Sequence, residues 1–279
     1  MTTTVAPSAA THRGEVRIGS REAVAQAAAL ARRSIRGTIR QPQVWLPGLL
    51  FPMFIAAVNT STMGKAVEFL PGFTGVDSLL DFLLPASITQ SVLFGGLTAG
   101  SDTATDIQTG FFDRLLASPV ARTSILVGRL AGAAVTGAVQ AIVFIFVYGL
   151  FGAEVRGGAP GALALVLFAM VLALVIGGFA AMLALRTGSA EAVQNVFPLT
   201  FISLFISSAF FPTESMHGIY KSIATRNPIT WMVDGMRHQV VVGFDGSEAA
   251  RSIAVAAALA VLAIFGAHHA LRARLRATT

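Results

Sequence analysis

Six long apolar stretches that carry almost no charge fill most of the sequence between Gln43 and Arg272. A helix needs roughly 20 apolar residues to cross a bilayer, and these stretches are long enough to do so. A soluble core would place polar residues at helical or strand spacing, and these stretches scarcely do so. We therefore predict an all-α, polytopic membrane protein with six transmembrane helices, at Val44–Thr62, Leu79–Ser101, Ser124–Gly152, Gly161–Leu185, Val193–Phe211 and Ser252–Leu271.

Ionisable side chains are nearly absent from the predicted spans. Among aspartate, glutamate, lysine and arginine, only Asp81 and Arg129 fall inside them, each near one end of its helix. Ion-coupled transporters usually carry carboxylates or histidines at membrane depth, because these groups take up and release the coupling ion. The pattern disfavours an ion-coupled secondary transporter and indicates that the energy for any transport comes from a partner.

Positive charge is distributed unevenly between the two sides of the predicted bundle. Seven arginines precede the first span, and more follow the second, fourth and sixth spans, whereas the opposite side carries only six basic residues. Basic residues are retained in the cytoplasm, so we predict a multi-pass protein of the cytoplasmic membrane with both termini cytoplasmic. The net charge of +6 then reflects topology and not nucleic-acid binding.

Several kinds of chemistry are disfavoured by what the sequence lacks. It has no cysteine, and its lysines, Lys65 and Lys221, do not lie in a Walker A loop. Its histidines lack an H-E-x-x-H motif or a carboxylate pair at membrane depth, which disfavours a membrane-embedded lipid-modifying enzyme or protease. We expect no catalytic centre, cofactor or metal in this chain. Residues 1–19 lack the apolar core of a cleavable signal peptide and are expected to form a flexible tail.

A basic amphipathic helix is predicted at residues 20–42, ahead of the first span. Its apolar residues recur at spacings of four and three, and arginines occupy much of the remaining surface. Such a helix is typical of the membrane interface. A soluble helix whose arginines only set the topology is the alternative. The Gln41–Pro42 pair, directly before the first span, favours the interfacial position.

The longest predicted cytoplasmic connection, residues 101–123, carries an apolar patch on a short helix. Phe111, Phe112, Leu115 and Leu116 lie on one side, and Ser118–Pro119 ends the helix. An exposed apolar patch needs a cover. Packing against its own bundle and docking of a cytoplasmic protein are equally favoured by the sequence.

The predicted outer segment, residues 212–250, contains an apolar part too short to span a membrane. Asn227–Pro228 is a typical helix start, and we predict re-entrant or interfacial helices here, before the last span. Asp234 and Arg237 lie three residues apart on this helix and can pair. We predict that they are partly buried and maintain the shape of an outer gate.

Polar side chains within the spans concentrate on two helices. They lie along stripes of the second and fifth spans, which favours the lining of a translocation path: Ser87, Gln90, Ser91, Thr98, Thr200, Ser203 and Ser207. Hydroxyls that merely bond to their own helix are an equally weighted alternative. The neighbouring Phe197, Phe201 and Phe205 are typical of packing. On the third span, Gly128 and Gly132 permit close approach of another helix.

Three segments in order resemble the ABC-2 type permeases, the membrane subunits of ABC exporters. The first is GFFDRLLASPVARTSILVGRL at Gly110–Leu130, which is similar to the stretch between the second and third spans of that family. The second is RTGSAEAVQNVFPL at Arg186–Leu199, and the third is NPITWMVDGMRHQVVVG at Asn227–Gly243. The resemblance covers most of residues 20–275, and it is nearest to permeases of the daunorubicin-resistance type.

This resemblance implies a transmembrane domain at 43–275 and a role for each predicted segment. Residues 20–42 would form the connecting helix, and Thr105–Ala117 would hold a coupling helix that contacts a separate ATPase subunit, the binder of ATP and Mg. The residues expected at this contact are Asp106, Phe111, Phe112, Arg114, Leu115 and Leu116.

The resemblance also implies that two permeases, identical or homologous, face each other around the path. Residues Asn227, Pro228, Asp234 and Arg237 would belong to its outer gate. The expected substrate is an amphiphilic, drug-like or lipid-like molecule, because the path would be apolar with a few hydroxyls and one amide.

Overall fold

The computed structural model describes residues 20–64, 78–118 and 120–277, and within these ranges it contains helices, turns and no strand. The predicted tail at 1–19 and most of the first outer connection lie outside the described residues. The elements are α1 (Ser20–Ile39), α2 (Pro42–Met63), α3 (Leu79–Gln108), α4 (Phe111–Ala117), α5 (Arg122–Leu150), α6 (Gly158–Thr187), α7 (Ala190–Gln194), α8 (Phe197–Phe205), the 3₁₀ turn η2 (Thr213–Ser215), α9 (Gly218–Ala224), α10 (Pro228–Val241) and α11 (Gly246–Ala277).

Five of the described helices are long and apolar enough to cross a membrane: α2, α3, α5, α6 and α11. The prediction of an all-α membrane protein is therefore confirmed. The predicted fifth span, Val193–Phe211, is divided between α7 and α8 by a turn at residues 195–196. The nine residues of α8 measure about 14 Å at 1.5 Å per residue, so α8 is too short to span alone. A sixth crossing remains a prediction.

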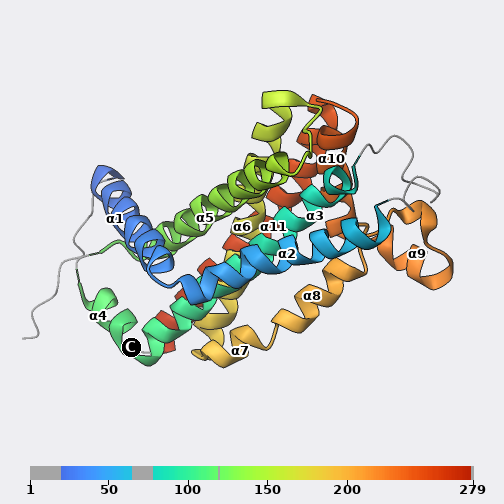
Figure 1. The fold of residues 1–279 in the computed structure, drawn as a ribbon. Coiled ribbons are helices and arrows are strands. Elements are labelled where there is room, and N and C mark those ends of the chain that lie inside the picture. The colour runs from blue at the N-terminus through green and yellow to red at the C-terminus, as the bar shows by residue number, and fades with distance from the viewer. Residues whose placement is uncertain (1–19, 65–77, 119, 278–279) are drawn as a thin grey trace, which may run out of the picture.

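The elements sort into two ends of one bundle (Figure 1). Helix α1, the short α4 and α7, and the C-terminal end of α11 lie at one end, whereas α9 and α10 lie at the other. Between α7 and α9 the chain runs along the bundle through α8. After the roles predicted for them from the sequence, the end with α1 and α4 is called the coupling end, and the end with α9 and α10 the outer end.

Helix α3 lies at the centre of the bundle and contacts α2, α5, α6 and α10. Most of its apolar residues are buried. Small residues allow this packing, because Gly96 and Gly100 face Ile176 and Ala180 of α6 with no room for a Cβ atom. At 30 residues, α3 is about 45 Å long. It therefore exceeds the roughly 30 Å hydrocarbon core, and we expect its last turns to project beyond that core.

Local sequence signals explain several helix boundaries. The Ser78 hydroxyl caps α3 by accepting a bond from the Leu80 amide at 3.2 Å, and the Asn227 side chain caps α10 by accepting one from the Ile229 amide at 2.9 Å. Helix α10 thus begins at the predicted Asn227–Pro228 pair. Helix α6 ends at Gly188, whose φ of 65° is accessible to glycine at little cost.

Candidate functional site

Helix α1 is seated against the N-terminal half of α5. Gly128 and Gly132 of α5 face Ala27, Leu30 and Ser34 so closely that an added Cβ atom would lie within 3 Å of them. Hydrogen bonds complete the contact: the Gln26 side chain accepts from the Ala121 amide at 2.9 Å, and the Ser124 hydroxyl donates to the Ala23 carbonyl at 2.9 Å. The predicted amphipathic helix is therefore fixed to the bundle along one side.

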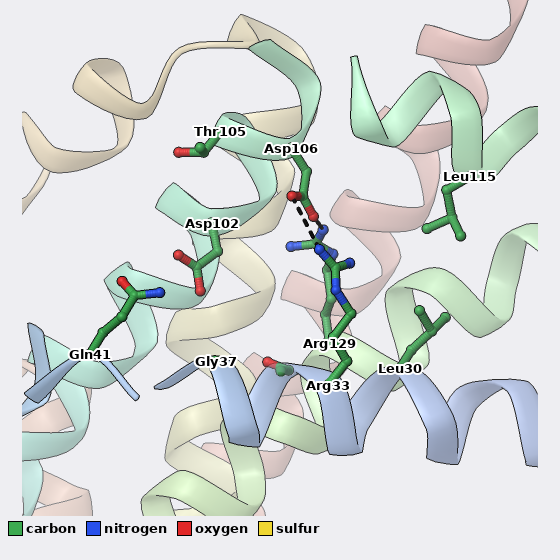
Figure 2. A pocket seen from close by; sticks show the side chains of 10 residues that line it. Leu30, Arg33, Gly37, Gln41, Asp102, Thr105, Asp106, Leu115 and Arg129 are labelled. Atoms are coloured by element: carbon green, nitrogen blue, oxygen red, sulfur yellow. Dashed lines mark hydrogen bonds and ion pairs between the residues drawn. The ribbon is translucent and has the colours of Figure 1, made fainter. Parts of the chain in front are cut away.

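A charge cluster joins α1, α3 and α5 at the coupling end (Figure 2). Arg129 of α5 forms an ion pair with Asp106 of α3, and it also donates to the Thr103 hydroxyl at 3.0 Å. Arg33 of α1 approaches the same Asp106 carboxylate at 3.7 Å. The Arg33 guanidinium also lies 4.0 Å from the centre of the Phe111 ring, which opens α4. The Asp106 carboxylate thus joins α1, α3 and α5, and Arg33 extends the contact to α4.

A cavity of about 260 Å³ lies beside this cluster. Figure 2 shows Asp102 and Thr105 of α3 on one side and Gly37 of α1 below, with Arg33 and Arg129 crossing between α1 and α3. No hydrogen bond or ion pair in the described residues involves the Asp102 carboxylate. The cavity therefore brings two carboxylates, Asp102 and Asp106, together with two guanidinium groups near the end of α3.

The short helix α4 packs its apolar side against its own bundle. Phe112 is only 1% exposed, in a cluster with Ile107, Ile125 and Leu271, and Leu115 and Leu116 are half-buried against the same cluster. Asp113, Arg114 and Ala117 are exposed. Of the two alternatives for the apolar patch, packing under the bundle is the one observed, and Phe112 is not available to a partner in this conformation.

Three of the four α3 residues predicted to line a path, Ser87, Gln90 and Ser91, are buried inside the bundle. The Ser87 hydroxyl is bonded to the Tyr148 hydroxyl at 2.6 Å, and Gln140 of α5 donates to the Ser91 carbonyl at 3.2 Å. The Gln90 amide is 1% exposed and has no hydrogen-bond partner among the described residues. A buried amide without a partner is costly, so Gln90 is the most unusual polar group of the bundle interior.

The remaining predicted path residues bond largely within their own helices. The hydroxyls of Thr98, Thr200 and Ser203 each donate to the carbonyl four residues earlier, and Ser207 donates to the Leu204 carbonyl. This pattern matches the alternative in which the hydroxyls satisfy their own backbone.

A row of phenylalanines packs α8 against α2 and α3. Ring centres are 4.8 Å apart between Phe94 and Phe197 and 6.0 Å apart between Phe51 and Phe201. Phe205 continues the row, with its ring 4.9 Å from that of Phe201. Separations of this size are favourable for aromatic pairs, so the predicted stripe serves packing between three helices.

At the outer end, Arg237 of α10 holds three chain segments together. It pairs with Asp234 at 2.7 Å, donates to the Ser208 and Ala209 carbonyls at 2.8 and 3.1 Å, and donates to the Phe82 carbonyl of α3 at 3.2 Å. Its side chain is 11% exposed, whereas that of Asp234 is 45% exposed. Burial was predicted for both residues, and it is pronounced only for the arginine.

Most partners of the predicted site residues were not predicted from the sequence. The Arg129–Asp106 pair had a usable signal, because an arginine near the end of one span and a carboxylate near the end of the neighbouring span lie at the same depth. No sequence signal pointed to Tyr148 as the partner of Ser87. None pointed to the carbonyl partners of Arg237 either, since backbone acceptors look alike in every sequence.

Together, the long apolar helices and the all-helical bundle define a multi-pass membrane protein. The ABC-2 type transporter family matches the chain over residues 25–241, and the chain belongs to this family. A protein of Porphyra purpurea named as transport permease ycf38 is 26% identical over 80% of this chain and 76% of its own length. A protein of Mycobacterium tuberculosis named as doxorubicin resistance ABC transporter permease DrrC is 23% identical over 68% of this chain and 67% of its own. The chain is thus a membrane component of an ABC transporter.

Proposed function

We propose that this chain is the permease subunit of an ATP-driven exporter that moves an amphiphilic, drug-like or lipid-like molecule across the cytoplasmic membrane. A separate cytoplasmic ATPase subunit binds ATP and Mg, and a second permease, identical or homologous, completes the path. Family membership and the likeness to a permease named for doxorubicin resistance support this function.

The placement of α4 is the observation that carries the proposed coupling. Phe112 attaches α4 to the bundle, and Arg33 links Phe111 to the charge cluster of Asp106 and Arg129. A push on α4 would therefore reach α1, α3 and α5 together. In this proposal the exposed side of α4, formed by Asp113, Arg114 and Ala117, contacts the ATPase.

This assignment modifies the contact expected from the sequence. Phe112, Leu115 and Leu116 serve to hold α4 to the permease, and Asp106 and Phe111 transmit its movement. Among the expected contact residues, Arg114 keeps an exposed position suitable for a partner.

We place the translocation path beside α2, α3 and α8, where Gln90 lacks a partner and the phenylalanine row provides apolar surface. Conformational change would be needed to expose Ser87, Gln90 and Ser91, because all three are buried in this state. Arg237 and Asp234, with Asn227 and Pro228 at the start of α10, would hold the outer end closed.

Co-purification tests the proposed coupling surface. The permease is expressed with an ATPase carrying a Walker A motif from a neighbouring reading frame, and Asp113→Arg and Ala117→Trp are compared with Ser222→Trp on exposed α9. The α4 variants should lose the ATPase while retaining the thermal stability of the parent, since their side chains point away from the bundle. Normal association of both α4 variants would overturn the proposed surface. In a separate assay of the purified complex, stimulation of ATP hydrolysis by amphiphilic compounds would identify the substrate class.

A further inference from the structure

An apolar groove lies beneath α1, on the side facing away from the charge cluster. It has a volume of about 260 Å³ and lies between the last turns of α1, the start of α2 and the middle of α5. Its walls are almost wholly apolar and include Ile35, Ile39, Trp45, Leu49, Val139 and Val143. Ile39 and Val139 are more than half exposed, so the groove is open toward the membrane. Its size suits a segment of one acyl chain.

A stripe of arginines borders the same part of α1. Arg32, Arg36 and Arg40 follow one another at helical spacing of four, are all exposed, and line a shallow hollow of about 420 Å³. Ile35 and Ile39 each follow one of these arginines by three residues, so the apolar and cationic stripes adjoin along the helix. No carboxylate of the described residues forms an ion pair with these three arginines, whereas Arg33 on the neighbouring side is engaged by Asp106.

One polar atom of a residue that lines the groove also lacks a partner. The indole nitrogen Nε1 of Trp45 is buried and makes no hydrogen bond to the described residues. An indole N–H donates only, and because this one is buried, the Trp45 ring must turn toward the groove before the N–H can donate to an acceptor from outside the protein. Tryptophan is enriched at the level of lipid headgroups, where ester oxygens provide such acceptors.

We propose that this groove binds an anionic phospholipid from the leaflet in contact with α1, which the charge distribution predicts to be the cytoplasmic leaflet. The lipid phosphate lies at Arg32 and Arg36, an ester oxygen accepts from Trp45, and one acyl chain follows Leu49 and Val143. The adjoining apolar and cationic surfaces favour this occupant over a zwitterionic lipid, because unpaired guanidinium groups select phosphate with net negative charge. The bound lipid would fix the free side of α1, whose other side is already seated on α5.

Quenching of Trp45 fluorescence by brominated lipids tests the site directly. Trp231, the only other tryptophan, is first replaced by Phe. The purified protein is then reconstituted into vesicles containing increasing fractions of phosphatidylglycerol or phosphatidylcholine with brominated acyl chains. Quenching by the brominated phosphatidylglycerol should reach its half-maximum at a severalfold lower mole fraction than quenching by the brominated phosphatidylcholine. The difference should diminish at high salt, since screening weakens the phosphate contact.

Matched variants separate the headgroup from the acyl chain. The double variant Arg32→Gln, Arg36→Gln should abolish the preference for phosphatidylglycerol, while Arg272→Gln, an exposed arginine at the end of α11, should preserve it. Val139→Phe should reduce quenching by both lipids because it fills the groove, whereas Val261→Phe on the exposed side of α11 should not. If the double variant does not insert, the single arginine variants and the salt series test the same point.

Equal quenching by the two lipids in the parent protein would overturn the proposal, since the groove would then be filled by bulk lipid. A preference that persists in the arginine variants would also overturn it, because the selection would lie elsewhere. The fluorescence measurement requires no ATPase, so its result is independent of the proposed transport function.

Discussion

At the scale of single residues, two charged groups that lie close to the spans, Arg129 and Asp106, are engaged with each other. Arg129 and Asp106 are 14% and 19% exposed and pair where α3 and α5 reach the coupling end. An unpaired charge at such a position would be costly, whereas a pair with further hydrogen bonds is tolerated. The cluster therefore fixes the relative position of two long helices at the end where α4 is attached.

A double-mutant cycle tests this pair. Asp106→Asn and Arg129→Gln should each destabilise the permease by about 1–3 kcal/mol, because each leaves a partly buried charge without its partner. The double variant should lose less than the sum of the two. Thermal unfolding in detergent provides the measurement, with Arg272→Gln as the exposed control. Strict additivity would show that the two side chains do not act as a pair.

Arg237 is the corresponding residue of the outer end. Arg237→Lys should reduce transport, because one ammonium group cannot reproduce donation to three carbonyls and Asp234 from a planar guanidinium. Arg226→Lys, an exposed arginine bonded to Ser222 of its own segment, is the control. Membrane insertion and ATPase binding should be normal in both variants. Transport at the parent rate by Arg237→Lys would reduce Arg237 to an ordinary packing residue.

At the scale of elements, the close contact of α1 with α5 depends on two glycines. A Cβ atom at Gly128 would lie 2.6 Å from the Cβ atom of Leu30, whereas nothing lies within 4 Å of a Cβ atom at Gly149 in the same helix. Replacing either glycine by alanine raises helix propensity by the same amount. The two substitutions therefore differ only in whether the added methyl group has room.

Gly128→Ala should therefore destabilise the protein by about 1–3 kcal/mol, as overpacking does, and should loosen α1. Gly149→Ala should be neutral or slightly stabilising. Thermal unfolding, together with proteolysis at the exposed arginines of α1, measures both effects. Equal stability of the two variants would contradict the seating of α1 on α5.

Much of the element structure was predictable because its signals are local. The apolar stretches predicted the five long helices, and Asn227–Pro228 predicted the start of α10. Gly128 and Gly132 predicted a close helix contact without identifying α1 as the partner, since the other side of the contact lies about a hundred residues away. The sequence also could not decide the position of Phe112, because an apolar face fits its own bundle and a partner equally well.

At the scale of the whole molecule, both ends of the described chain lie at the coupling end of the bundle. This arrangement agrees with an even number of crossings, which requires the segment that contains α7 and α8 to traverse the bilayer. The sequence predicted that span as one helix. The turn at residues 195–196 divides it, and Pro198 near the start of α8 lacks the amide hydrogen needed to continue a helix from α7.

Cysteine labelling tests the resulting topology in a chain that has no cysteine of its own. Ser222→Cys on α9 should react with a membrane-impermeant reagent in intact cells, because that helix is predicted to face outward. Ser8→Cys, in the predicted cytoplasmic tail, should react only after the cells are opened. Labelling of Ser8→Cys in intact cells would reverse the orientation.

The central claim, that a separate ATPase drives transport through this permease, is tested most directly in inside-out membrane vesicles. These contain the permease, its ATPase and a fluorescent amphiphile that stimulates ATP hydrolysis. The account predicts ATP-dependent accumulation of the amphiphile, which disappears when the Walker A lysine of the ATPase is replaced. Accumulation that persists without ATP hydrolysis and follows an ion gradient would contradict the account.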